Sequence, residues 1–137
     1  MLTTEFRFPL RVYWEDTDAG GVVFYANYLK FFERARTEWL RSMGFSQEAL
    51  RREAGLMFVV ADTAVRYRAP ARLDDWLEIT VIPRQDGPRS RAAMTLEQQA
   101  WRGADLLAEG SIRIGCVSTT TWRPCRIPQP ILDQMPS

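Results

Sequence analysis

Two carboxylates and two glycines lie close together in the chain, directly before a strongly patterned helical segment. The carboxylates are Asp16 and Asp18, and the glycines are Gly20 and Gly21. A carboxylate can attack an activated acyl carbon or take a proton from an attacking water. Gly20 and Gly21 are expected to let the backbone adopt positive φ and come close to a ligand, and the first amides of a helix have no intrahelical partners. The segment 15–28 therefore combines a nucleophile or base with donors for a developing negative charge.

The amides at the start of the helix are the candidate oxyanion donors, because they are aligned with the positive end of the helix dipole. Asp18 stands directly before the glycine pair, and Asp16 is expected to support the loop by accepting backbone hydrogen bonds. On spacing alone, both aspartates can equally be loop-capping residues before a helix, and this alternative stays open. The expected donors are the backbone amides of Val23, Phe24 and Tyr25.

The chain contains no histidine and two cysteines, Cys116 and Cys125. The absence of histidine excludes catalysis by Ser–His and Cys–His pairs. The cysteines form no CxxC pair, so we expect buried structural thiols and no zinc site. Any catalysis must then rest on carboxylates and backbone groups, and we expect no metal and no cofactor.

Charge and hydropathy exclude several classes of protein. The net charge is +1 and the arginines are scattered among glutamates, so we expect no nucleic-acid groove. No run approaches the roughly 18 apolar residues of a membrane span, and residues 1–5 lack the pattern of a signal peptide. We expect one cytoplasmic domain over residues 1–137, with a tail that can be irregular from about residue 125.

The segment 27–43 has the apolar period of an amphipathic helix. Asn27 is the expected N-cap, and Gly44 is expected just past the C-terminus. A second, short helix is expected from Ser46 to Arg52 or Glu53, closed by Gly55. The expected apolar stripe of the long helix consists of Tyr28, Leu29, Phe32, Ala35, Trp39, Leu40 and Met43.

Alternating polar and apolar residues predict strands over 6–14, 56–68, 76–83, 90–101 and 106–119. Pro9 indicates that the first strand lies at a sheet edge or carries a kink, and Trp14 is expected on the apolar face of this strand. The four later strands suggest an antiparallel meander, and the tail from Thr120 is expected to continue as an edge segment and fray. The fold class is therefore α+β, with about five to six antiparallel strands curved around a long central helix.

The stretch from Glu15 to Arg41 and the order of the expected helices and strands together resemble a known family. The stretch reads E-D-T-D-A-G-G-V-V-F-Y-A-N-Y-L-K-F-F-E-R-A-R-T-E-W-L-R. It is similar to the hotdog-fold acyl-CoA thioesterases of the 4-hydroxybenzoyl-CoA thioesterase type, and more narrowly to the bacterial Tol-Pal-associated acyl-CoA thioesterases. The resemblance implies hydrolysis of acyl-CoA thioesters by a homodimer or homotetramer with active sites at subunit interfaces.

Carried across by this motif, the family's catalytic carboxylate falls on Asp18. Many members have histidine where this chain has Tyr25, although the 4-hydroxybenzoyl-CoA branch also carries tyrosine there. A thiol leaving group has a pKa near roughly 8.5, so a thiolate departs with little help from a general acid. Asp18 can attack the carbonyl carbon or activate a water, and the sequence leaves both routes open.

Coenzyme A carries phosphates, which guanidinium groups bind well. Arg89 and Arg91 match the region that contacts the nucleotide in the resembling family. Arg66 and Arg68, which face one way on their strand, are second candidates.

Four residues of the loop and helix are further candidates for the site. Gly20 and Gly21 are expected to bring the backbone against the substrate. Tyr25 and Asn27 are candidates for substrate contact, with wall packing and helix capping as the alternatives. Glu33 is a candidate second acid or base, with a solvated ion-pair network to Arg34 and Arg36 as the alternative.

The resemblance names acyl-CoA as the substrate, and acyl carrier protein is a second candidate partner. The alternative function is a non-catalytic acyl-CoA or acyl-carrier-protein binding module that lost its chemistry along with the usual histidine. A hotdog dehydratase or hydratase is disfavoured, because those enzymes commonly pair a carboxylate with histidine. The sequence fixes neither the acyl chain length nor the choice between dimer and tetramer.

Overall fold

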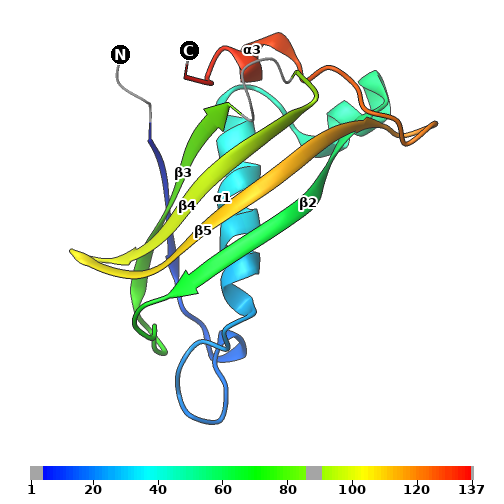
Figure 1. The fold of residues 1–137 in the computed structure, drawn as a ribbon. Coiled ribbons are helices and arrows are strands. Elements are labelled where there is room, and N and C mark those ends of the chain that lie inside the picture. Colours follow the sequence, from blue (N-terminus) through cyan, green and yellow to red (C-terminus); the bar gives the residue numbers. More distant parts are fainter. Residues whose placement is uncertain (1–4, 86–90, 137) are drawn as a thin grey trace.

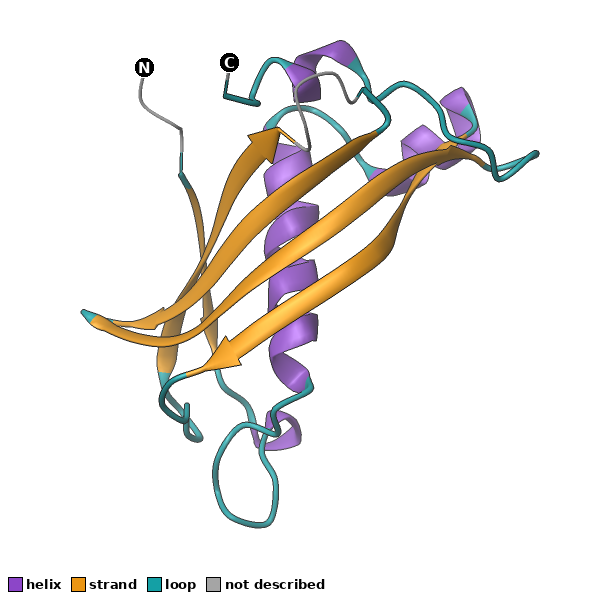
Figure 2. Cartoon of the chain, viewed as in Figure 1, coloured by secondary structure: helices purple, strands orange, loops and turns teal. Residues whose placement is uncertain are grey.

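The computed structural model describes residues 5–85 and 91–136 of the chain. Within these residues, one antiparallel sheet of five strands lies against the long helix α1 (Asn27–Ser42) (Figure 1). The strands are β1 (Phe6–Arg11), β2 (Leu56–Tyr67), β3 (Trp76–Gln85), β4 (Ala93–Arg102) and β5 (Asp105–Ser118). Figure 2 shows the short helices beyond the ends of the strands, so α1 alone covers the face of the sheet. The predicted α+β fold, a sheet wrapped around one long helix, is confirmed.

The strand order in the sheet is β1-β3-β4-β5-β2. The expected meander of four strands is therefore wrong: β3, β4 and β5 form a meander, whereas β2 pairs with β5. The reason is that β1 occupies the other edge of β3, with Leu10 opposite Leu77. The only place left for β2 is the free edge of β5. Both β1 and β2 are edge strands, as Pro9 predicted for β1.

The helix α1 buries one apolar face against the sheet. Phe32 lies directly over Gly110 of β5, where an added Cβ would come within 3.1 Å of the ring. Leu29 was expected in this face but is exposed, and Phe31 takes its place in the core. The buried residues of α1 are Tyr28, Phe31, Phe32, Ala35, Trp39 and Leu40. No helix among residues 5–85 and 91–136 combines the length and apolar character that crossing a membrane requires.

The observed helix ends agree in part with the ends that the sequence predicts. Asn27 is not the N-cap: Ala26 holds that position without a side-chain bond, and Asn27 is the first helical residue. Gly44 adopts φ +87° just past the C-terminus, as expected. Ser46 caps the next helix, α2 (Gln47–Ala49), by accepting a hydrogen bond from the Ala49 amide at 2.9 Å.

The first strand ends before Trp14, contrary to expectation. Trp14 begins a 3₁₀ turn, η1 (Trp14–Asp16), and its side chain is 81% exposed. The chain turns here because the Asp16 carboxylate accepts a hydrogen bond from the Tyr13 amide at 2.8 Å. Trp14 therefore lies in the loop that carries the candidate site, and not on the apolar face of the strand as expected.

The tail does not fray as expected but packs against the core. A short helix, α3 (Gln129–Leu132), follows Pro128, and a proline is well accommodated in the first turn of a helix. Ile127 and Ile131 are both fully buried. Burial of these two side chains outweighs the loss of chain freedom in the tail.

Both cysteines are free thiols, and they differ in burial. Cys116 lies in the core, where burial raises the pKa of its thiol to about 11. The structural role predicted for Cys116 is confirmed by its position. Cys125 is only half-buried, so it matches that prediction in part.

Candidate active site

The loop between β1 and α1 projects beyond one end of the sheet, at the lower side of Figure 1. The Val12 amide donates to the Asp75 carbonyl at 2.9 Å, and the Val23 amide donates to the Ala71 carbonyl at 2.8 Å. Both acceptors belong to the connection between β2 and β3. The loop is thus fastened at each end, and Asp18 lies in its projecting part.

Asp18 is held in a tight turn by its own backbone and side chain. Its amide donates to the Val22 carbonyl at 2.9 Å, and its carbonyl accepts from the Gly21 amide at 3.0 Å. Its Oδ1 atom accepts from the Gly20 amide at 2.8 Å. The residue is exposed, and within the described parts of the chain Oδ2 accepts no hydrogen bond. One carboxylate oxygen is therefore fixed and the other is open to a ligand.

The two glycines have different roles in this turn. Gly21 adopts φ +80°, as expected, but Gly20 has no positive φ, contrary to expectation. Gly20 is needed for another reason: an added Cβ would lie 3.2 Å from the Asp18 Oδ1 atom. The absence of a side chain at position 20 lets the carboxylate accept the amide proton.

A Gly20→Ala substitution should therefore displace the Asp18 carboxylate. If Asp18 is the reacting carboxylate of the expected thioester hydrolysis, kcat should fall roughly tenfold, because small misplacements of a reacting group are costly. The matched control is Gly115→Ala, where the new Cβ would meet nothing closer than 3.9 Å. Parallel kinetics and thermal melts check this, and equal kcat values for the two variants would contradict it.

Asp16 supports the loop, as expected. It is only 5% exposed, and its carboxylate accepts from the Tyr13 amide. Its carbonyl accepts from the Phe24 amide at 3.1 Å and from the Asn27 side chain at 2.9 Å. Asp16 is thus a loop-capping residue, as the alternative proposed. Asp18 caps the loop only by accepting the hydrogen bond from the Gly20 amide.

Two of the three expected oxyanion donors are already engaged. The Val23 amide donates to the Ala71 carbonyl, and the Phe24 amide donates to the Asp16 carbonyl. The amide of Tyr25 donates no hydrogen bond to any residue in 5–85 or 91–136. Of the expected set, only the Tyr25 amide is available to a substrate oxygen.

Asp18 and Tyr25 line different hollows at this end of the sheet. The hollow at Asp18 measures about 450 Å³, and the hollow at Tyr25 measures about 280 Å³. The first is lined by Trp14, Thr17, Asp18, Ala19, Gly21 and Leu73. The second is lined by Val23, Tyr25, Tyr28, Tyr67, Arg68, Ala69 and Pro70. Leu73 and Tyr67 were missed as site residues, because contacts between distant segments have no signal in one sequence. Trp14 was missed because it was expected on the apolar face of the first strand.

Tyr28 closes the floor of the second hollow. Its side chain is buried, and its hydroxyl accepts a hydrogen bond from the Ala71 amide at 3.1 Å. Burial raises the pKa of this phenol, so it stays neutral well above physiological pH. Three tyrosines, Tyr25, Tyr28 and Tyr67, therefore line this hollow together with the charged Arg68.

The arginines predicted for coenzyme A do not gather at Asp18. Arg89 lies outside the described residues, and Arg91 is exposed just before β4. The other end of β4 is the end near the site, because Arg102 donates to the Pro70 carbonyl at 3.1 Å. A strand of this length spans roughly 30 Å, so Arg91 and Asp18 of one chain lie far apart.

Of the second candidates, Arg68 does reach the site. It lines the hollow at Tyr25 and forms an ion pair with Glu109. Its charge is therefore partly compensated where a phosphate or carbonyl group would approach. Arg66 lies elsewhere, over the outer face of the sheet.

Glu33 is exposed on α1 and lines neither of these two hollows. It accepts a hydrogen bond from the Thr37 hydroxyl at 2.5 Å. The expected network is not present as direct ion pairs: within residues 5–85 and 91–136, Glu33 has no ion pair with Arg34 or Arg36, although, against the larger effect of burial, its charge raises the pKa of Arg36. Arg36 instead donates to the buried Gln98 at 3.0 Å, and burial lowers the pKa of its guanidinium.

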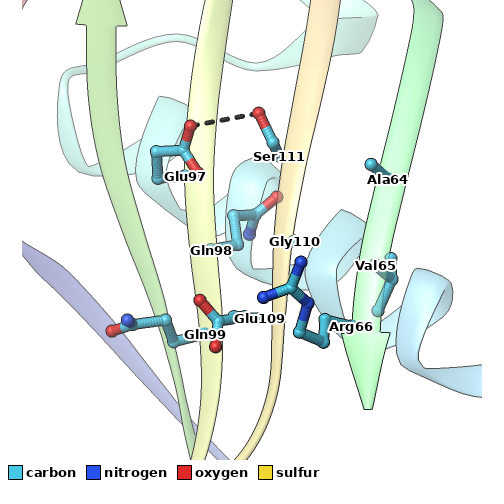
Figure 3. A pocket seen from close by; sticks show the side chains of 9 residues that line it. All are labelled: Ala64, Val65, Arg66, Glu97, Gln98, Gln99, Glu109, Gly110 and Ser111. Atoms are coloured by element: carbon cyan, nitrogen blue, oxygen red, sulfur yellow. Dashed lines mark hydrogen bonds between the residues drawn. The ribbon is translucent and has the colours of Figure 1, made fainter.

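A further hollow lies on the outer face of the sheet, away from the loop (Figure 3). The Ser111 hydroxyl donates to Glu97 at 3.0 Å, and Arg84 pairs with the same carboxylate at 2.9 Å. These side chains satisfy one another, so the hollow offers no free nucleophile. Nowhere in the described parts of the chain do three or more histidine, cysteine, aspartate or glutamate side chains gather where they could hold a metal ion.

Comparisons with known proteins agree with this architecture. The family model of the thioesterase-like superfamily matches residues 12–135. The acyl-CoA thioesterase YbgC of Haemophilus influenzae is 42% identical over 132 residues, which cover 96% of this chain and 94% of that protein. The acyl-CoA thioester hydrolase YbgC of Escherichia coli O157:H7 is 46% identical over 136 residues, which cover 98% of each chain.

A solved structure extends the likeness to three dimensions. A probable thioesterase from Bartonella henselae superimposes with a TM-score of 0.82 at 33% identity, over 91% of this chain and 100% of that one. Sequence, fold and family model thus agree over nearly the whole length. The chain belongs to the thioesterase-like superfamily of hotdog-fold proteins.

Proposed function

We propose that this chain hydrolyses acyl-CoA thioesters with Asp18 as the reacting carboxylate. The observation that carries the proposal is the Asp18 side chain itself: Oδ1 accepts from the Gly20 amide, Oδ2 accepts no hydrogen bond from the described residues, and the residue lines a hollow. The YbgC relatives are named as acyl-CoA thioesterases, which supports the same substrate class. The test is thiol release from acyl-CoA by the wild type and by Asp18→Asn.

Two balanced routes lead from Asp18 to products. In the first, the carboxylate oxygen attacks the thioester carbon, the carbon–sulfur bond breaks, and the thiolate leaves a mixed anhydride that water hydrolyses. In the second, the carboxylate takes a proton from water, the water oxygen attacks, and the departing thiolate receives the proton. Both routes yield free acid and CoA, and both need the carboxylate in its charged form.

The Tyr25 amide is the proposed donor to the thioester oxygen. It donates no hydrogen bond to the described residues, and it lies where α1 begins, at the positive end of the helix dipole. A donor that is fixed before the reaction stabilises the oxyanion without reorganisation, and losing one typically costs about 10²- to 10³-fold in kcat. Tyr25 thereby contributes through its backbone, which fits a family position that also accepts histidine.

We further propose that the active enzyme contains at least two copies paired along β2. This strand is 12 residues long and lies at an edge of the sheet. An exposed edge strand is a template for pairing with another chain. Val60 of β2 is 52% exposed, so an apolar side chain lies open on this edge strand.

Within one chain, Arg91 lies far from Asp18. Antiparallel pairing of two β2 strands would bring Arg91 of one copy toward Asp18 of the other. It places the start of one β2 beside the end of the other, in the two-fold arrangement common in dimers. The end of the sheet that carries Arg91 in the second copy then lies near Asp18 of the first. Arg91 would meet the phosphates of a substrate whose thioester reaches the partner's loop.

A Val60→Lys substitution should weaken this pairing. Burying an ammonium group in an apolar interface is costly, so we expect the solution mass to shift from dimer or tetramer toward monomer. The control is Ala104→Lys, which adds the same charge at the exposed turn between β4 and β5. Light scattering after size-exclusion chromatography measures the mass, and an unchanged assembly for Val60→Lys would contradict pairing along β2.

The alternative remains a binding module for acyl-CoA or acyl carrier protein. It would bind the thioester tightly and release no thiol in the wild type. The open Oδ2 atom of Asp18 favours the enzyme, because a carboxylate kept only for the turn needs no free oxygen at a hollow.

A further inference from the structure

Tyr67 connects the end of β2 to the turn that precedes α1. Its hydroxyl donates to the Tyr25 carbonyl at 2.9 Å, across 42 positions of the sequence. Its ring also meets the Tyr25 ring edge-on at 6.0 Å and the Tyr28 ring at 5.5 Å. One side chain thus contacts both the backbone and the ring of the residue whose amide is proposed to bind the oxyanion.

Apart from the bond to Tyr67, the Tyr25 carbonyl accepts only a long hydrogen bond from the backbone of the described residues. The Tyr28 amide reaches it at 3.4 Å, whereas the Asn27 amide reaches the Phe24 carbonyl at 2.8 Å. Hydrogen bonds weaken as the distance grows beyond about 3.2 Å. The turn before α1 is therefore loosest at Tyr25, and the Tyr67 hydroxyl supplies its shorter bond.

We propose that Tyr67 is a positioning residue that fixes the Tyr25 backbone so that its amide points at the thioester oxygen. This inference rests on the proposed function, because it assigns Tyr67 a role only in that reaction. A preorganised donor contributes more than one that must reorient during the reaction. Tyr67 itself does not touch the reacting atoms.

The state of the phenol is compatible with this role. Partial burial, and next the neighbouring Tyr25, raise the pKa of Tyr67. A raised pKa keeps the proton on the hydroxyl throughout the neutral range, so the group remains a donor. Tyr67 is 44% exposed, so water can reach the space that its hydroxyl would leave. Removal of the hydroxyl should therefore cost little stability.

The test compares Tyr67→Phe with Tyr67→Leu. Tyr67→Phe keeps the ring and removes the donor, so kcat should fall about tenfold while KM changes less than about twofold and the melting temperature stays near that of the wild type. Tyr67→Leu removes both and should lose at least as much. Normal kcat in Tyr67→Phe would overturn the proposal, and an additional loss in Tyr67→Leu would then assign the residue to packing.

A matched control separates this effect from the loss of any hydroxyl. Ser42 donates to the Trp39 carbonyl at 2.6 Å at the other end of α1, and Ser42→Ala should leave kcat unchanged. Asp18→Asn is assayed beside these variants. If Asp18→Asn is inactive and Tyr67→Phe is normal, only the positioning role fails; if Asp18→Asn is fully active, the proposed site itself fails.

Discussion

Asp18→Asn should bind acyl-CoA and hydrolyse it about 10²- to 10⁴-fold more slowly than the wild type, the range expected for a positioned base or nucleophile. The asparagine keeps an oxygen that can accept the Gly20 amide proton, so the turn should persist. Its amide group can neither attack the carbonyl nor take a proton from water. The loss should appear in kcat, and steady-state thiol release at saturating substrate measures it.

The control for this variant is Asp133→Asn. Asp133 is exposed at the end of α3, and its carboxylate accepts a hydrogen bond from the Gln129 side chain at 2.8 Å, so like Asp18 it is an exposed carboxylate with one hydrogen-bonded oxygen. It should leave kcat unchanged. Slow turnover in both variants would point to a general effect of charge, and turnover near the wild-type rate in Asp18→Asn would contradict the proposed mechanism.

Phe32→Ala should lower the free energy of unfolding by about 3–5 kcal/mol, the usual cost of truncating a buried phenylalanine. Phe32 is fully buried, and it lies over Gly110 of β5. Because Gly110 has no side chain that could move into the space, the cavity should stay largely unfilled. Urea unfolding at a fixed protein concentration measures the change, since oligomerisation makes stability concentration-dependent.

Lys30→Ala is the matched control on the same helix. Lys30 is exposed, and such surface substitutions usually change stability by less than about 0.5 kcal/mol. A loss below about 1 kcal/mol in Phe32→Ala would contradict the packing of α1 on Gly110. Because alanine has the highest helix propensity, a loss of several kcal/mol in both variants would indicate that α1 is sensitive to substitution in general, and that burial of Phe32 does not explain the result.

The elements themselves could be predicted from local patterns. The stripe of α1 and the alternation along the strands each depend on neighbours a few residues apart, and so do the turn at Gly44 and the cap at Ser46. The pairing of the strands does not. The position of β2 beyond β5 follows from β1 filling the edge of β3, which is a contact between distant segments.

The same distinction applies to the candidate site. The motif located the loop and Asp18, but it could not reveal that the amides of Val23 and Phe24 are engaged by Ala71 and Asp16. Nor could it reveal Tyr67, whose hydroxyl donates to the Tyr25 carbonyl although the two residues are 42 positions apart in the sequence. Local sequence predicts which residues can react, and long-range packing decides which of their donors are free.

The reaction at Asp18 is tested most directly by single-turnover hydrolysis, with enzyme in excess over acyl-CoA, in the wild type and in Asp18→Asn. Under these conditions neither product release nor a change in KM can hide the chemical step. The proposed mechanism predicts that both proteins bind the thioester and that Asp18→Asn cleaves it at least about 100-fold more slowly. Equal single-turnover rates in the two proteins would contradict it.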